Sequence, residues 1–457
     1  MGITRRAILA GAAALGGLPR LLRAETAADG ATVIKARIVD ARLMGAEGPL
    51  TNVWSYGDDA PPLILHARQG EELKYRFINE LDRAVNLHWY GVRGPATAMN
   101  LVIEPGPGHA VDCVFTPPDA GTFWFGPVTD CSRLRDMGLY GLLIVDEAGG
   151  PGAAFADVPF VFDDWRLSNE GLVDTESFGA LVDAIGQGRL GNWFTVNGQF
   201  RPRIETGSGL LRLRVLNAAN VRTMSLAFKG ADPWFIAADG QPVKPASLGT
   251  QGVELAPGQR ADLLIDPGTD DIIIALDLFE DTVEIAYLIR KGAPEAADLP
   301  DNFRLPANPI ASSVALDGVA AIPLVIEGGE KGGMEGAIYQ GGHLELRALL
   351  EKGMAWALNG TAGLPALPWQ AFKQGSTVLL EIANKTKFDQ PLHLQGHVWR
   401  LLDEPGEDIW RDTLVIAAAK TTRAVFVANN PGEWRLHSTI AERLDAGLIT
   451  AFTVEAE

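Results

Sequence analysis

Histidine and cysteine are the side chains of this chain that could hold a transition metal, because imidazole nitrogen and thiolate sulfur are donors that copper and zinc prefer. Both residue types are scarce, since the 457 residues include seven histidines and two cysteines. Four of the histidines lie in short segments that also carry Trp, Leu or Gly: His88, His393, His397 and His437. What chemistry they can do depends on the fold that positions them.

The pattern along the chain is that of a β protein. Short runs rich in Val, Ile, Leu and Phe are separated by Gly, Pro, Asp and Asn at intervals of about eight to twelve residues. Three runs share one signature, a half-buried strand pattern that ends in Asn, at 72–79, 211–217 and 377–384. They recur at intervals of about 140 and 170 residues, which indicates a domain-sized internal repeat.

Two breaks in composition divide the chain. Residues 148–154 are rich in Gly, Ala and Pro, and the stretch from Gly292 to about Ala321 lacks periodicity. We therefore expect an all-β protein with three tandem Greek-key β-sandwich domains. The predicted domains are 30–147, 158–291 and 322–457, and the one helix that the pattern favours lies around 177–187.

Four segments resemble, in order and position, the four copper motifs of the multicopper oxidases. They are 87–91, 121–128, 390–397 and 432–440. Members of that family have three cupredoxin-like domains, and motifs in the first and last domains hold one blue copper and a three-copper cluster. The resemblance covers nearly the whole chain after its first residues, and it implies three cupredoxin-like domains here.

At the blue-copper positions the resemblance implies that the metal is absent. Ser438 stands where the family has its cysteine ligand, Gln390 and Arg443 stand at the two histidine positions, and Leu448 stands at the axial methionine position. A blue copper needs a thiolate, which a serine hydroxyl does not replace. The expected protein is therefore no oxidase, and we assign it no catalytic residue and no cofactor.

Three of the eleven ligands that the family would have are kept. His88 and His393 match type 2 copper positions, and His437 matches a type 3 position. Other residues stand at the remaining type 3 positions: Tyr90, Gly126, Val128, Gln395 and Thr439.

Alternatives remain open for these three histidines. They could form one copper or zinc site with three imidazoles, which would make the protein a divergent oxidoreductase. They could instead be interface residues that hydrogen-bond to neighbours such as Tyr90 or Gln395. A third possibility is a module that binds a small molecule in the space where the family holds its three-copper cluster.

The two cysteines, Cys113 and Cys131, bracket a predicted core strand at 121–125. An isolated pair in an exported protein favours a disulfide, and two buried thiols are the alternative.

The first residues have the layout of a signal peptide. Arg5 and Arg6 precede a weakly apolar Ala/Gly/Leu run, which predicts a twin-arginine signal over 1–28 and a periplasmic location. No other stretch approaches 18 apolar residues, so we expect no stable membrane span. The formal net charge of −18 disfavours nucleic acid as a partner.

An exported three-cupredoxin chain without copper ligands resembles the FtsP family of cell-division proteins. That resemblance implies a non-catalytic scaffold that binds periplasmic proteins of the divisome and supports cell division under stress.

Overall fold

The computed structural model describes residues 25–456, apart from 100–104, 150–154, 208, 250, 267, 269, 279–280, 293–302, 312–313, 331 and 403–408. Most of the expected signal peptide, including Arg5 and Arg6, lies outside the described residues. Among the residues described, no helix has both the length and the apolar character needed to cross a membrane.

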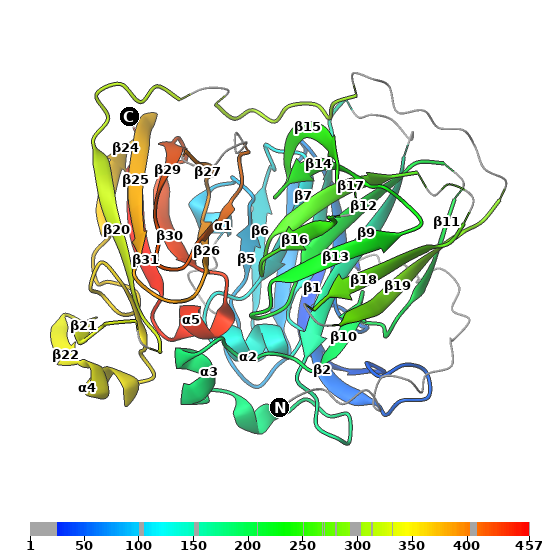
Figure 1. Ribbon diagram of the computed structural model, residues 1–457, viewed down its shortest axis with the longest axis horizontal. Helices are drawn as coiled ribbons and strands as arrows, with labels where there is room; N and C mark the ends of the chain where they lie inside the picture. The colour runs from blue at the N-terminus through cyan, green and yellow to red at the C-terminus, as the bar shows by residue number, and fades with distance from the viewer. Residues whose placement is uncertain are drawn as a thin grey trace.

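The chain forms three β-sandwiches, which confirms the all-β expectation. Figure 1 shows the third sandwich at the left and the second at the right. The strands of the three run over 32–146, 156–290 and 321–455. The predicted domain boundaries at 30–147, 158–291 and 322–457 remain a proposal.

The first sandwich contains β1 (Thr32–Ala41), β2 (Thr51–Ser55), β3 (Leu63–Arg68), β4 (Leu73–Asn79), β5 (His88–Tyr90), α1 (Ala96–Met99), β6 (Ala110–Phe115), β7 (Gly121–Gly126), α2 (Cys131–Asp136) and β8 (Gly141–Asp146). Its sheets have the orders β2-β1-β4-β6 and β3-β8-β7-β5.

The second sandwich contains β9 (Ala156–Trp165), η2 (Thr175–Ser177), α3 (Leu181–Ile185), β10 (Trp193–Val196), β11 (Arg203–Thr206), β12 (Leu211–Asn217), β13 (Met224–Lys229), β14 (Trp234–Ala238), β15 (Gln241–Ser247), β16 (Val253–Leu255), β17 (Arg260–Ile265), β18 (Ile272–Asp277) and β19 (Thr282–Arg290). Its sheets have the orders β10-β9-β12-β17-β14-β15 and β11-β19-β18-β13-β16.

The third sandwich contains β20 (Ala321–Gly328), β21 (Gly336–Tyr339), β22 (Gly342–Glu345), α4 (Leu346–Leu350), β23 (Trp356–Leu358), β24 (Gln370–Lys373), β25 (Ser376–Asn384), β26 (Gln390–Leu394), β27 (Trp399–Leu401), β28 (Thr413–Ile416), β29 (Thr421–Ala428), β30 (Gly432–Ser438), α5 (Ala441–Asp445) and β31 (Ile449–Glu455). Its main sheets have the orders β23-β20-β25-β29-β27 and β24-β31-β30-β26-β28, and β21 and β22 form a hairpin beside them.

The internal repeat predicted from the sequence corresponds to a local structure that occurs once in each sandwich, a strand that ends in a buried asparagine. The three asparagines that end the runs, Asn79, Asn217 and Asn384, are each buried at the end of a strand: β4, β12 and β25. In each case Oδ1 accepts the backbone N–H two residues later at 3.0 Å. Nδ2 donates to one carbonyl of the loop that follows, that of Arg83, Arg222 or Phe388, and to a second carbonyl from a distant segment, that of Pro105, Leu255 or Ile416. The amide therefore satisfies buried backbone groups where the chain leaves the sheet, which explains why the same residue recurs.

Arg260 of β17 joins all three sandwiches. It is fully buried, its Nε donates to the carbonyl of Thr122 in the first sandwich at 3.2 Å, and its Nη1 donates to Asp412 Oδ1 in the third at 3.0 Å. Burial works to lower the pKa of this guanidinium, but Asp412 and Asp239 outweigh it and hold the pKa above its ordinary value.

Three short helices gather at one end of the junction between the sandwiches. In Figure 1, α2, α3 and α5 lie near one another, and both α2 and α3 contact α5. The helix expected around 177–187 is only the five residues of α3. Gly179 has a φ of 75°, a left-handed conformation that separates η2 from α3.

Candidate functional site

The histidines that match copper positions come from three strands, His88 from β5, His393 from β26 and His437 from β30, and all are fully buried. His393 and His437 are cross-strand partners in one sheet. The Nε2 atoms of His88 and His393 lie 3.2 Å apart across the boundary between the first and third sandwiches. The fold therefore places two imidazoles nitrogen to nitrogen.

Both outer nitrogens of this pair face an oxygen acceptor. His88 Nδ1 lies 3.0 Å from the carbonyl of Met99, and His393 Nδ1 lies 3.0 Å from Asp412 Oδ1. If both Nδ1 atoms donate, the facing Nε2 atoms need one proton or one metal ion between them. The pattern is complete when His393 carries two protons and donates from Nε2 to His88.

Asp412 is suited to accept a hydrogen bond from His393 Nδ1. Burial works to raise the pKa of Asp412, but the Arg260 guanidinium and the hydrogen bond from His393 outweigh it and hold the pKa below the ordinary value. The carboxylate is thus ionised, and it accepts hydrogen bonds from both Arg260 and His393.

His437 is not part of that pair. Its Nδ1 donates to the carbonyl of Ser438 at 2.8 Å, and its Nε2 accepts from Gln395 Nε2 at 3.3 Å. Burial lowers the pKa of His437 well below its ordinary value, and the charge of His393 adds to the effect, so the ring is neutral. Both nitrogens therefore have partners within the protein.

The donor set does not fit a metal site with three imidazoles. Within the described part of the chain, no group of three or more His, Cys, Asp or Glu side chains is arranged to hold a metal ion. His88 and His393 alone present facing Nε2 atoms, and no thiolate lies with them. We therefore derive no chemistry through a bound metal.

Tyr90 occupies the space among the three imidazoles. Its ring centroid is 4.6 Å from that of His88, 4.9 Å from that of His393 and 6.1 Å from that of His437. The ring also stacks on Trp124 at 3.7 Å, and its hydroxyl donates to the carbonyl of Pro127 at 2.8 Å. A small molecule in this space would have to displace a ring that is 1% exposed.

Arg443 stands at a blue-copper position and has protein partners there. Its Nη1 donates to Gln390 Oε1 at 2.8 Å and to the carbonyl of Asp389 at 2.7 Å. The guanidinium lies 4.9 Å from the ring centroids of both Trp356 and Phe388. Burial lowers the pKa of Arg443 to about 10, so it remains a cation at neutral pH.

The side chains at two further blue-copper positions, Ser438 and Leu448, also pack within the protein. Ser438 is fully buried, and its Oγ accepts the backbone N–H of Ile440 at 3.1 Å. Leu448 is fully buried in the apolar core. Neither side chain offers a soft donor to copper.

The disulfide expected between Cys113 and Cys131 is not formed, and both residues are free thiols. Cys113 is half-buried on β6, where it packs against the main core, and it contacts Tyr75. Cys131 begins α2, is fully buried in a different apolar cluster, and donates its thiol hydrogen to the carbonyl of Pro127 at 3.4 Å. Proximity along the sequence was therefore a poor guide, because the two thiols belong to separate parts of the core.

Sequence reasoning missed the charged residues of the helix junction. Glu442 of α5 and Arg135 of α2 are buried there, Asp445 of α5 is half-buried, and the buried Arg189 lies beside them. The charged run that follows the fourth motif, 441–445, was the available signal, because it turns towards the other two sandwiches instead of towards solvent.

Models of the multicopper oxidase family match two parts of the chain, residues 39–149 and 344–457. These parts contain the strands that carry His88, His393 and His437. The chain is a multicopper-oxidase-like protein. The resemblance to the multicopper oxidases expected from the four sequence motifs is confirmed.

Individual relatives agree with this family. The chain is 24% identical over 453 residues to multicopper oxidase MmcO of Mycobacterium tuberculosis, covering 88% of this chain and 83% of the relative. It is 23% identical over 402 residues to cell division protein FtsP of Photorhabdus laumondii, covering 80% and 76%. A crystal structure of a multicopper oxidase from Pseudomonas thermotolerans superimposes with a TM-score of 0.79 at 27% identity, covering 94% of this chain and all of that one. The multicopper-oxidase-like chain is thus close both to oxidases and to FtsP.

Proposed function

We propose that this protein is a non-catalytic periplasmic scaffold that binds proteins of the cell-division machinery and supports division under stress. The observation that carries the proposal is the Arg443 guanidinium, which bonds to Gln390 and lies against Trp356 and Phe388 where the family holds its blue copper. A buried cation with its own partners opposes the binding of a second cation at the same place. Without that copper, electrons from a substrate have no entry.

The histidine cluster supports the same proposal. Tyr90 lies among the three imidazoles, and both nitrogens of His437 are hydrogen-bonded within the protein. These contacts give the histidines a packing role between the first and third sandwiches. Similarity to proteins that carry the name cell division protein FtsP supports a role in division and a periplasmic location.

The direct test is the behaviour of the protein in its own cells. A fluorescent fusion with the complete N-terminus should concentrate at the division site, and a deletion strain should divide abnormally under envelope stress. A catalytically silent function also requires rescue of the deletion by a variant with all three histidines replaced by Gln, provided that the variant folds. A fusion spread evenly around the periplasm, together with normal division of the deletion strain, would contradict the proposal.

Export is tested separately. We propose the twin-arginine route, so the double substitution Arg5→Lys and Arg6→Lys should leave the precursor in the cytoplasm. Substitution of Arg20 and Arg23 by Lys is the matched control, because it also changes two arginines near the N-terminus but leaves the Arg5–Arg6 pair intact. Normal export of the first variant would argue for another route.

A further inference from the structure

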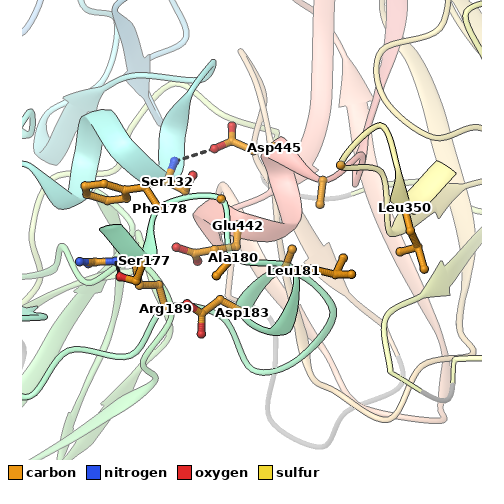
Figure 2. Close-up of a pocket in the computed structure, with 14 residues that line it drawn as sticks. Ser132, Ser177, Phe178, Ala180, Leu181, Asp183, Arg189, Leu350, Glu442 and Asp445 are labelled. Carbon is orange, nitrogen blue, oxygen red and sulfur yellow. Dashed lines mark hydrogen bonds between the residues drawn. The ribbon is translucent and has the colours of Figure 1, made fainter. Parts of the chain in front are cut away.

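A pocket of about 150 Å³ lies where the three sandwiches meet. Figure 2 shows its walls, which come from the segment around α3, from α5 and from the start of α2. The pocket is separate from the histidine cluster, because none of the residues that line it is one of the three histidines or Tyr90. It also has no part in the function proposed above.

Glu442 is the residue of this pocket whose side chain indicates a ligand. The residue is 7% exposed and lines the pocket. Its Oε1 accepts from Asn220 Nδ2 at 3.4 Å, whereas Oε2 is buried and has no hydrogen-bond partner. A buried carboxylate oxygen without a donor is unfavourable unless a ligand supplies one.

The other charged groups of the lining have partners within the protein. Asp183 accepts from Arg166 at 2.8 Å, and one oxygen of Asp445 accepts the backbone N–H of Cys131 at 2.8 Å. The other oxygen of Asp445 accepts the backbone N–H of Ser132 at 2.7 Å (Figure 2).

Arg189 is also engaged. It forms an ion pair with Asp136, and it donates to Ser177 Oγ at 3.0 Å and to the carbonyl of Asp174 at 2.6 Å. Among the charged side chains that line the pocket within the described residues, Glu442 thus offers an acceptor oxygen to which no internal cation donates a hydrogen bond, although Arg135, Arg189 and Arg443 lie near enough to interact with its charge.

Apolar groups form the remainder of the wall. Phe178, Leu181, Leu350 and Ala446 line the pocket, and Leu181 is 45% exposed at its edge. We propose that the pocket binds an alkylammonium group, which donates to Glu442 Oε2 while its methylene chain packs along Phe178 and Leu181. A flexible chain with a charged end matches a pocket that has apolar walls and one carboxylate.

The same chemistry has two sources, a free aliphatic amine or the lysine side chain of a protein. Isothermal titration of the mature protein at pH 8 with n-butylamine and with Nα-acetyl-lysine amide distinguishes them. We expect saturable binding of at least one probe at millimolar concentration. Comparable binding of both probes indicates a lysine side chain as a source, and binding of butylamine alone indicates a free amine. Neutral 1-butanol is the matched probe and should bind at least about tenfold more weakly.

Two variants test the assignment. Glu442→Gln keeps the shape and removes the charge, and it should weaken binding at least about tenfold. Leu181→Trp should block the pocket while leaving Glu442 in place, and Val182→Trp is its control, because Val182 is 73% exposed and does not line the pocket. Leu181→Trp serves as the test if the first variant fails to fold.

Protonation gives an independent readout. Burial raises the pKa of Glu442 to about 7, in the presence of Arg135, Arg189, Arg443 and Asp445, so amine binding should fall as the pH is lowered from 8 to 6. Absence of binding by either amine, equal binding of butanol, or unchanged affinity in both Glu442→Gln and Leu181→Trp would overturn the proposal.

Discussion

Arg443 and Gln390 are hydrogen-bonded to each other at 2.8 Å, although both stand at positions that face a copper ion in the oxidases. The amide oxygen of Gln390 accepts from the guanidinium, and the amide nitrogen donates to Thr386 Oγ1 at 3.0 Å. The Gln390 amide and Arg443 Nη1 therefore have partners within the protein, whereas Arg443 Nε has no hydrogen-bond partner. In the proposed correspondence with the copper motifs, a protein cation takes the place where the family uses a metal cation.

The contacts of Arg443 predict a contribution to stability. Arg443→Ala would remove two hydrogen bonds and two aromatic contacts from a buried site, so it should lower the free energy of unfolding by about 2 to 4 kcal/mol. Urea denaturation followed by fluorescence measures this. Arg347→Ala is the control, since that side chain is 93% exposed, and its effect should stay within about 0.5 kcal/mol. Equal effects of the two variants would contradict a structural role for Arg443.

Copper loading should not produce a blue protein. Ser438 and Gln390 lack the donors of a blue-copper site, so copper added to the purified protein should give no intense visible absorption, and phenolic substrates should not turn over. The same assay on a multicopper oxidase is the positive control. A thiolate-to-copper band or sustained phenol oxidation would refute the proposed absence of oxidase activity.

The His88–His393 pair should depend on a proton instead of a metal. We expect single substitutions of His88, His393 and His437 by Ala to cost about 1 to 3 kcal/mol each, because each leaves a gap and unpaired polar neighbours. Elemental analysis of the parent should find no metal near one equivalent. One equivalent of copper or zinc in the parent that disappears in the His88 and His393 variants would show that a metal lies between the two Nε2 atoms.

Glu442 should make stability depend on pH. Its pKa rises from 4.5 in the unfolded chain to about 7 in the folded protein, because burial favours the protonated form. Its contribution is therefore fully present below pH 4.5 and is lost as the pH rises through about 7.

Glu442→Gln removes this dependence. Between pH 5 and pH 8 the variant should gain about 1 to 3 kcal/mol relative to the parent. Thermal melts across that range measure the difference, with Glu351→Gln as an exposed control. A constant difference between Glu442→Gln and the parent would mean that Glu442 does not titrate in this range.

The two cysteines should react as free thiols of unequal accessibility. In the native protein a thiol reagent should label Cys113 slowly and leave Cys131 unlabelled, because burial raises the pKa of Cys131 to about 12. After unfolding without reductant, both should be labelled. If neither thiol were labelled after unfolding without reductant, the disulfide that the sequence favoured would be present.

The sequence predicted the fold well because the signals were local. The runs that end in Asn79, Asn217 and Asn384 showed both the strand period and the repeat, since each asparagine acts within its own loop. The motifs also identified His88 and His393, whose Nε2 atoms lie 3.2 Å apart. The Arg443–Gln390 bond was not foreseen, because the motif comparison says which ligand is missing and nothing about what fills its place.

The junction of the helices was beyond sequence reasoning for a different reason. Glu442 and Asn220 are far apart in the chain, and their contact depends on how the second and third sandwiches pack. A charged helix of five residues reads as solvent-exposed in isolation. The wrong prediction of a disulfide has the same cause, because Cys113 and Cys131 pack into two different apolar clusters that the sequence does not reveal.

Arg260 also bears on how the molecule comes apart. Its one side chain bonds to Thr122 in the first sandwich and Asp412 in the third, and Asp412 in turn contacts His393. Separation of the second and third sandwiches would part Arg260 from the Asp412 carboxylate, and loss of the first would remove the Thr122 carbonyl acceptor, so partial unfolding is disfavoured. The three sandwiches should therefore melt in a single calorimetric transition, and a fragment that contains only one or two of them should be prone to aggregation and degradation.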